Sequence, residues 1–107
     1  MKNVLDYLTW EHVELGVRIT GCDKSFEGSM VIPDHINGVA VVKIGEKAFA
    51  ECEKITSVVI PDTVKVVGKQ AFRDCSSLRR VVLPSILIAL ARDAFDESVD
   101  FVVYDDI

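Results

Sequence analysis

Three cysteines are the residues of this chain best suited to chemistry: Cys22, Cys52 and Cys75. Cys52 and Cys75 hold the same position in two adjacent 23-residue blocks, so we expect their α carbons one strand spacing apart, about 4.8 Å. Stacked equivalent side chains point in parallel, whereas a disulfide needs its Cβ atoms turned together at about 3.5–4.5 Å. We therefore predict that Cys52 and Cys75 are buried, reduced thiols rather than a disulfide, a metal site or a redox centre.

The other groups capable of catalysis form no recognisable site. His12 and His35 have no second histidine or cysteine at metal-ligand spacing. No serine lies in a G-x-S-x-G nucleophile elbow, and the chain contains neither a phosphate-binding loop nor an H-E-x-x-H motif. The sequence predicts no catalytic residue, cofactor, metal or small-molecule substrate. Many acidic residues fall at polar repeat positions and are interpreted as a solvated rim: Glu46, Glu51, Glu53, Asp74, Asp93, Asp96 and Glu97.

Length and charge restrict the class of protein. The 107 residues suffice for one domain, and half of them are apolar, which is typical of a chain with a packed core. A net charge of −5 is the wrong sign for binding nucleic acid or an anionic membrane. No apolar run approaches the roughly 20 residues of a membrane span, and the first residues do not resemble a secretory signal. We expect a cytoplasmic protein, or a cell-surface one if the chain is a domain of a longer exported protein.

A 23-residue repeat organises the chain. Residues 44–66 (IGEKAFAECEKITSVVIPDTVKV) and 67–89 (VGKQAFRDCSSLRRVVLPSILIA) align without a gap. A truncated copy occupies 90–107, a partial repeat occupies 30–43, and 1–29 is expected to supply the N-terminal cap and entry strands. Two full units between two partial ones are typical of a short solenoid, in which each coil covers its neighbour.

The recurring positions are those that a coil must bury. Val58 and Ile60 alternate with Ser57 and Val59 as in a half-buried strand, and Pro61 ends that strand. Each repeat is therefore expected to carry one short parallel strand, followed by an irregular or short helical return segment. A phenylalanine fills the interior of each coil, and the three equivalent residues are expected to be buried and in contact: Phe49, Phe72 and Phe95.

These residues resemble the BspA-type (Treponema pallidum-type) leucine-rich repeat, whose unit runs I-G-x-x-A-F-x-x-C-x-x-L-x-x-V-x-I-P-x-x-V-x-x. Residues 44–89 match that unit nearly throughout, and the resemblance covers about residues 16–104. It implies a β-rich leucine-rich-repeat solenoid. Members of the family are often long, exported bacterial surface proteins that bind host or matrix proteins, and this chain departs from them by being short.

An apolar flank is the first candidate partner-binding surface. After the repeat proline, the first full unit has threonine and lysine where the second has Ile86 and Ile88. Val42 and Val66 lie on the same predicted flank, so the four side chains are expected to form an apolar stripe. Such a stripe usually marks an interface on a monomer. The alternative is that the truncated last unit folds over the two isoleucines.

The strand face is the second candidate. Val31, Val59 and Val82 align as an outward row, and Arg80 stands beside them where it could contact an acidic partner. Repeat proteins commonly bind along this face, although β-propensity alone also explains valines there. We therefore expect a non-enzymatic protein-interaction or self-association module; the alternative is a structural spacer or a fragment of a larger bacterial surface protein.

The first fifteen residues are the hardest to assign. Val4, Leu5 and Leu8 have the spacing of a helical turn, whereas Tyr7 and the Thr9-Trp10 pair favour a strand. We predict a hairpin cap that shields the first coil.

Overall fold

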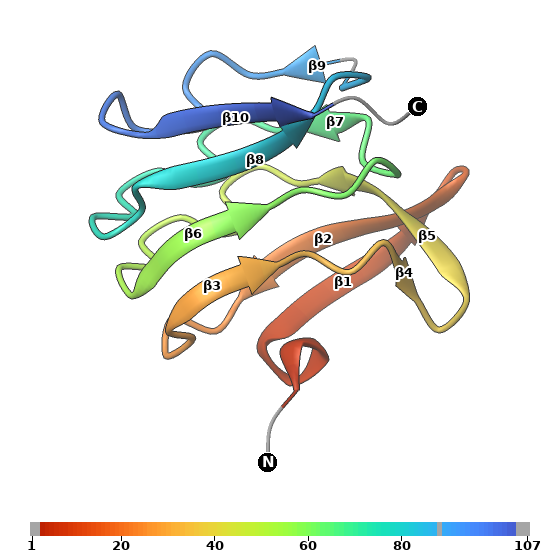
Figure 1. Ribbon diagram of the computed structural model, residues 1–107. Helices are drawn as coiled ribbons and strands as arrows, with labels where there is room; N and C mark the ends of the chain where they lie inside the picture. The colour runs from red at the N-terminus through yellow and green to blue at the C-terminus, as the bar shows by residue number, and fades with distance from the viewer. Residues whose placement is uncertain (1–2, 88, 105–107) are drawn as a thin grey trace.

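Two β-sheets face each other across a narrow core (Figure 1). The computed structural model describes residues 3–87 and 89–104. The four-strand sheet is entirely parallel, in the order β10-β8-β6-β3, and consists of β3 (Gly28–Val31), β6 (Ile55–Val59), β8 (Arg80–Pro84) and β10 (Asp100–Tyr104). The other, which we call the hairpin sheet, has the order β1-β2-β5-β7-β9 and consists of β1 (Leu8–Val13), β2 (Gly16–Cys22), β5 (Val39–Ile44), β7 (Val66–Val67) and β9 (Ala89–Leu90). The short β4 (His35–Ile36) pairs antiparallel with β5.

The predicted solenoid of stacked parallel strands is confirmed. The structure adds a second strand to each coil, where the sequence indicated an irregular return: β5, β7 and β9 pair in parallel. The reason is that the return segment also carries inward apolar residues, such as Val64 and Val67, which are almost fully buried. Backbone groups beside a buried face need partners, and the neighbouring coil supplies them.

The N-terminal hairpin covers the first coil, as predicted. β1 and β2 pair antiparallel, and β2 pairs in parallel with β5. A 3₁₀ helix, η1 (Val4–Tyr7), precedes the hairpin. The helical spacing of the first residues therefore corresponds to η1, and the strand pattern of Thr9 and Trp10 corresponds to β1. Asn3 starts this helix by accepting a hydrogen bond from the Leu5 backbone N–H at 2.9 Å. Leu8 then enters the core, and Tyr7 packs edge-on against Phe26 with ring centroids 5.1 Å apart.

A ladder of phenylalanines runs along the core. Phe49 and Phe72 are fully buried and stack nearly parallel, with ring centroids 4.7 Å apart. Phe72 and Phe95 stack at the same distance. The expectation that all three rings are buried is wrong for Phe95, which is half-buried because no described coil lies beyond it. Phe101 of β10 contacts its edge instead, at 5.3 Å.

Candidate functional site

The outer face of the four-strand sheet carries two straight columns of side chains. The valine column aligns Val31, Val59 and Val82 in register, as predicted, and adds Val102 from β10. With strands about 4.8 Å apart, it extends about 14 Å across the sheet. Its members at the two edges of the sheet are the more exposed, Val31 at 58% and Val102 at 38%.

A polar column runs beside the valine column. It consists of Ser29, Ser57, Arg80 and Asp100, in register across the same four strands. The Ser57 hydroxyl donates to the Ser29 hydroxyl at 2.7 Å. Arg80 and Asp100 are exposed neighbours at the other end of the column. The face therefore changes from hydroxyl groups at β3 and β6 to charged groups at β8 and β10. We call the two columns together the strand face.

The residues of the predicted apolar flank lie in two places. Val42 and Val66 both lie on the outer side of the hairpin sheet, where Val66 pairs in register with Lys43. Lysines therefore interrupt the apolar surface that these valines were expected to form. Ile86 lies in the turn after β8 and is 45% exposed, so the last coil does not cover it. Ile88 lies outside the described residues.

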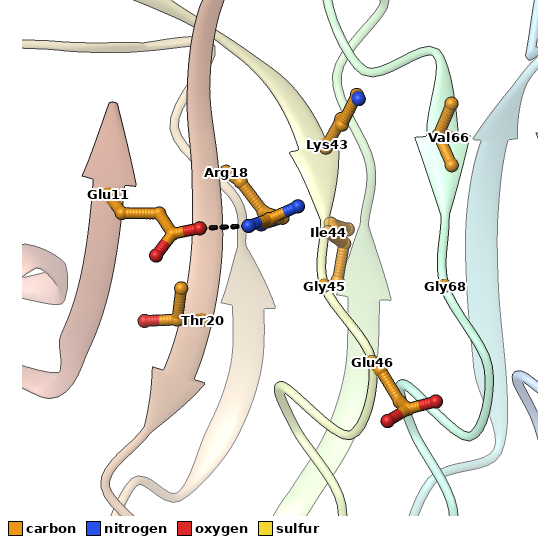
Figure 2. Close-up of a pocket in the computed structure, with 9 residues that line it drawn as sticks. All are labelled: Glu11, Arg18, Thr20, Lys43, Ile44, Gly45, Glu46, Val66 and Gly68. Atoms are coloured by element: carbon orange, nitrogen blue, oxygen red, sulfur yellow. Dashed lines mark hydrogen bonds and ion pairs between the residues drawn. The ribbon is translucent and has the colours of Figure 1, made fainter. Parts of the chain in front are cut away.

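Beside Val66 the hairpin sheet is hollowed into a groove of about 450 Å³ with a mixed polar and apolar lining (Figure 2). Its floor includes Gly45 and Gly68, which have no side chains to fill it. Arg18 and Lys43 bring positive charge to the groove, and Glu11 and Glu46 bring negative charge. Figure 2 shows Glu11 and Arg18 joined by an ion pair, while Lys43 stands apart from both glutamates.

The cysteines form a thiol ladder inside the solenoid. Cys52 and Cys75 are buried, as predicted, and the Cys75 thiol donates to the Phe49 carbonyl at 3.1 Å. The hydrogen bond with Cys52, together with burial, raises the pKa of Cys22 above its usual range. Cys22 is half-buried and packs against the core that contains Cys52, a position that the sequence did not indicate because Cys22 lies outside the aligned repeats. Burial raises the pKa of the Cys75 thiol to about 12.

These thiols are expected to be unreactive in the native protein. Alkylation needs a thiolate that the reagent can reach, and both side chains are buried, so iodoacetamide at pH 8 should leave Cys52 and Cys75 unmodified until a denaturant is added. Mass spectrometry of the labelled protein checks this, with a Cys22→Ser variant as the control that removes the more exposed thiol. A native mass two units low, with both thiols still unlabelled after unfolding, would show a disulfide.

The same burial predicts a loss of stability in alkaline solution. The folded-state pKa of Cys75 is raised, so its stabilising effect is complete below the ordinary value of 9.0 and declines as the pH rises to about 12. Urea unfolding at a series of pH values measures this decline, and Cys75→Ala should reduce it. An unchanged pH dependence in that variant would contradict the assignment.

The histidines do not converge on a metal site. His12 is exposed on β1, and His35 is exposed on β4 beside Asp34, with Nδ1 and Oδ1 3.2 Å apart. Among residues 3–87 and 89–104, no group of three histidine, cysteine or acidic side chains is arranged to hold a metal ion. In the same ranges no helix is long and apolar enough to span a membrane.

Two sheets whose repeat strands pair in parallel every 23 residues, with phenylalanines and cysteines stacked inside, define a leucine-rich repeat solenoid. The chain belongs to the family described as the BspA type leucine rich repeat region, whose model matches residues 24–102. None of the curated proteins compared with the chain is similar enough to count as a relative.

Solved bacterial structures share this fold. A T. pallidum leucine-rich repeat protein superimposes with a TM-score of 0.84 at 28% identity, over 95% of this chain and 50% of its own. A leucine-rich cell surface protein from Faecalibacterium prausnitzii A2-165 gives 0.74 at 28% identity, over 92% of this chain and 30% of its own. A leucine-rich repeat protein from Bacteroides capillosus shares the fold with a TM-score of 0.66 at 23% identity, over 92% of this chain and 94% of its own. The chain thus spans half or less of the first two proteins.

Proposed function

We propose that this chain is a non-enzymatic protein-interaction module that binds an extended segment of a partner protein across the strand face. The observation that carries the proposal is the valine column, whose four members lie in register across the whole four-strand sheet. An extended segment laid over it has an apolar row to contact and a parallel row of hydroxyl and charged groups to pair with. Leucine-rich repeat domains generally mediate protein interactions, which supports this class of function.

The experiment is affinity capture with a matched pair of variants. Val59→Thr combined with Val82→Thr keeps the β-branched shape but replaces one methyl group at each site with a hydroxyl. Each lost apolar group costs about 0.8 kcal/mol of burial, so binding should weaken by roughly tenfold. Glu46→Gln, in the turn after β5, is the control. Proteins captured from extracts of the source organism should be reduced with the double variant and unchanged with the control.

Two results would contradict the proposal. One is equal capture by the double variant and the parent, with both showing the same melting temperature. The other is the absence of any saturable partner, which would favour the alternative of a structural spacer.

A second candidate function is a segment of a larger bacterial cell-surface protein. It is favoured by the similarity to the F. prausnitzii cell surface protein, of which this chain covers 30%. In that setting the strand face would bind a host or matrix protein; otherwise we propose a cytoplasmic partner. Fractionation of the source bacterium followed by immunoblotting distinguishes the two locations.

The apolar flank is kept as a second proposed binding surface. If this surface is used, replacing Ile86 and Ile88 with lysine should shift the protein to a smaller species in light scattering, or abolish partner capture, with little change in melting temperature. A folded double variant that associates and captures partners as the parent does would show that this surface is not used, and one that unfolds would contradict the exposed position of Ile86.

A further inference from the structure

The turn of the N-terminal hairpin presents an unusual leucine. Leu15 has a φ of 73° and is 89% exposed. A left-handed backbone favours glycine or asparagine, and an exposed side chain gains nothing from packing, so neither conformation nor burial accounts for a leucine here. The other described non-glycine residues with positive φ are all polar: Asn37, Lys47, Glu51, Gln70 and Asp74.

Leu15 borders an apolar groove on the outer side of the hairpin sheet. The turn lies tightly against β5, because a Cβ at Gly16 would be only 2.4 Å from the Ala40 carbonyl oxygen and 2.8 Å from Cγ1 of Val42. The groove has a volume of about 410 Å³ and a mainly apolar lining, to which Leu15 and Val42 contribute. The remaining lining residues are Glu14, Lys43 and Lys65.

The groove also has more positive than negative charge. Lys43 lies directly opposite Arg18 in the sheet, and like charges in such positions destabilise strand pairing. Glu11 neutralises Arg18 (Figure 2). Lys43, in contrast, makes no ion pair or side-chain hydrogen bond with any residue that the structure describes. Lys65 adds a second ammonium group, which donates to the Asp62 carbonyl at 2.8 Å. Two lysines against Glu14 make this groove positive on a chain of net charge −5.

We propose that this groove, which we call the Leu15 groove, binds an extended acidic segment of a partner protein. A large apolar side chain of that segment packs between Leu15 and Val42, and a neighbouring carboxylate pairs with Lys43. The inference rests on the proposed function in taking a protein as the partner. The Leu15 groove lies on the opposite sheet from the strand face, so binding at one surface can be disproved while binding at the other stands.

The test uses fluorescein-labelled eight-residue peptides and fluorescence anisotropy. A peptide of alternating leucine and glutamate should bind saturably and more weakly as salt is added. A leucine–lysine peptide and a serine–glutamate peptide should bind at least tenfold more weakly, because the first lacks the anion and the second lacks the apolar anchor. Equal binding of all three peptides, or no binding of the leucine–glutamate peptide, would overturn the proposal.

Two variants locate the binding to the groove. Leu15→Asn should lower the affinity for the leucine–glutamate peptide at least fivefold while the melting temperature stays equal or rises, since asparagine tolerates positive φ better than leucine. Lys43→Glu should lower that affinity at least tenfold. Val59→Thr with Val82→Thr, on the strand face, should leave it unchanged. If a stably folded Leu15→Asn protein binds as well as the parent, the assignment is wrong.

Two further measurements test other occupants. Sedimentation equilibrium should give a monomer for both the parent and the Leu15→Asn protein. A parent dimer that dissociates in the variant would show that the groove binds a second copy of this chain, and would overturn the proposal of an acidic partner segment. The parent protein should not sediment with phosphatidylglycerol vesicles. Vesicle binding that depends on Leu15 would identify a lipid surface as the ligand and overturn the proposal.

Discussion

Replacing Phe72 with alanine is expected to lower the free energy of unfolding by about 3–5 kcal/mol, a large part of the stability of a domain of this size. Phe72 is fully buried and stacks on Phe49 and Phe95 at 4.7 Å on both sides. Removing its ring leaves a cavity in the middle of the ladder that neither rigid neighbour can fill. Urea denaturation of both proteins, monitored by circular dichroism, measures the difference.

Phe95→Ala is the matched control for this prediction. Phe95 occupies the same repeat position but is half-buried and stacks on one ring of the ladder, so its loss should cost clearly less than that of Phe72. Equal stability of the Phe72→Ala protein and the parent would mean that the coils do not stack as described.

Gly68→Ala is expected to cost about 1–3 kcal/mol through overpacking. An added Cβ would lie 2.9 Å from the Glu46 nitrogen, 3.0 Å from the Gly45 carbonyl carbon and 3.2 Å from the Ile44 oxygen. All three atoms belong to the backbone of the preceding coil, so no side-chain rotation relieves the contact. The coils must instead move apart, which strains the hydrogen bond from Gly68 N–H to the Ile44 carbonyl, 2.8 Å long.

Two other positions show why the loss of stability is expected to be large at Gly68. Gly21→Ala should cost less, because its added Cβ meets only the Thr9 hydroxyl, a side-chain group that can move at the expense of its hydrogen bond from Thr20. Ala91 holds the position equivalent to Gly68 in the last coil, and there the corresponding hydrogen bond to the Val67 carbonyl is longer, at 3.1 Å. No described coil stacks beyond Ala91, so that coil has room to shift, whereas Gly68 lies between two coils. A Gly68→Ala protein that unfolds at the same urea concentration as the parent would contradict this close packing.

The repeat by itself determined the fold, the inward side chains and the alignment of the valines on the strand face. The physical reason is that equivalent residues of consecutive coils stack one strand spacing apart. A period of 23 residues therefore places Phe49 on Phe72 and Val59 beside Val82 without further information. It also indicated the buried pair Cys52 and Cys75.

Other contacts were decided only by the tertiary structure. Cys22 packs against the core beside the buried thiols. Val102 completes the valine column because β10 pairs with β8 at a spacing of 20 rather than 23 residues. The Leu15 groove depends on where the hairpin turn lies against β5, and the register there shifts between Val17 and Arg18. A repeat relates positions a fixed distance apart, whereas the placement of a non-repeating hairpin depends on such a bulge and on the close approach of Gly16 to Ala40. Neither leaves a periodic signal in the sequence.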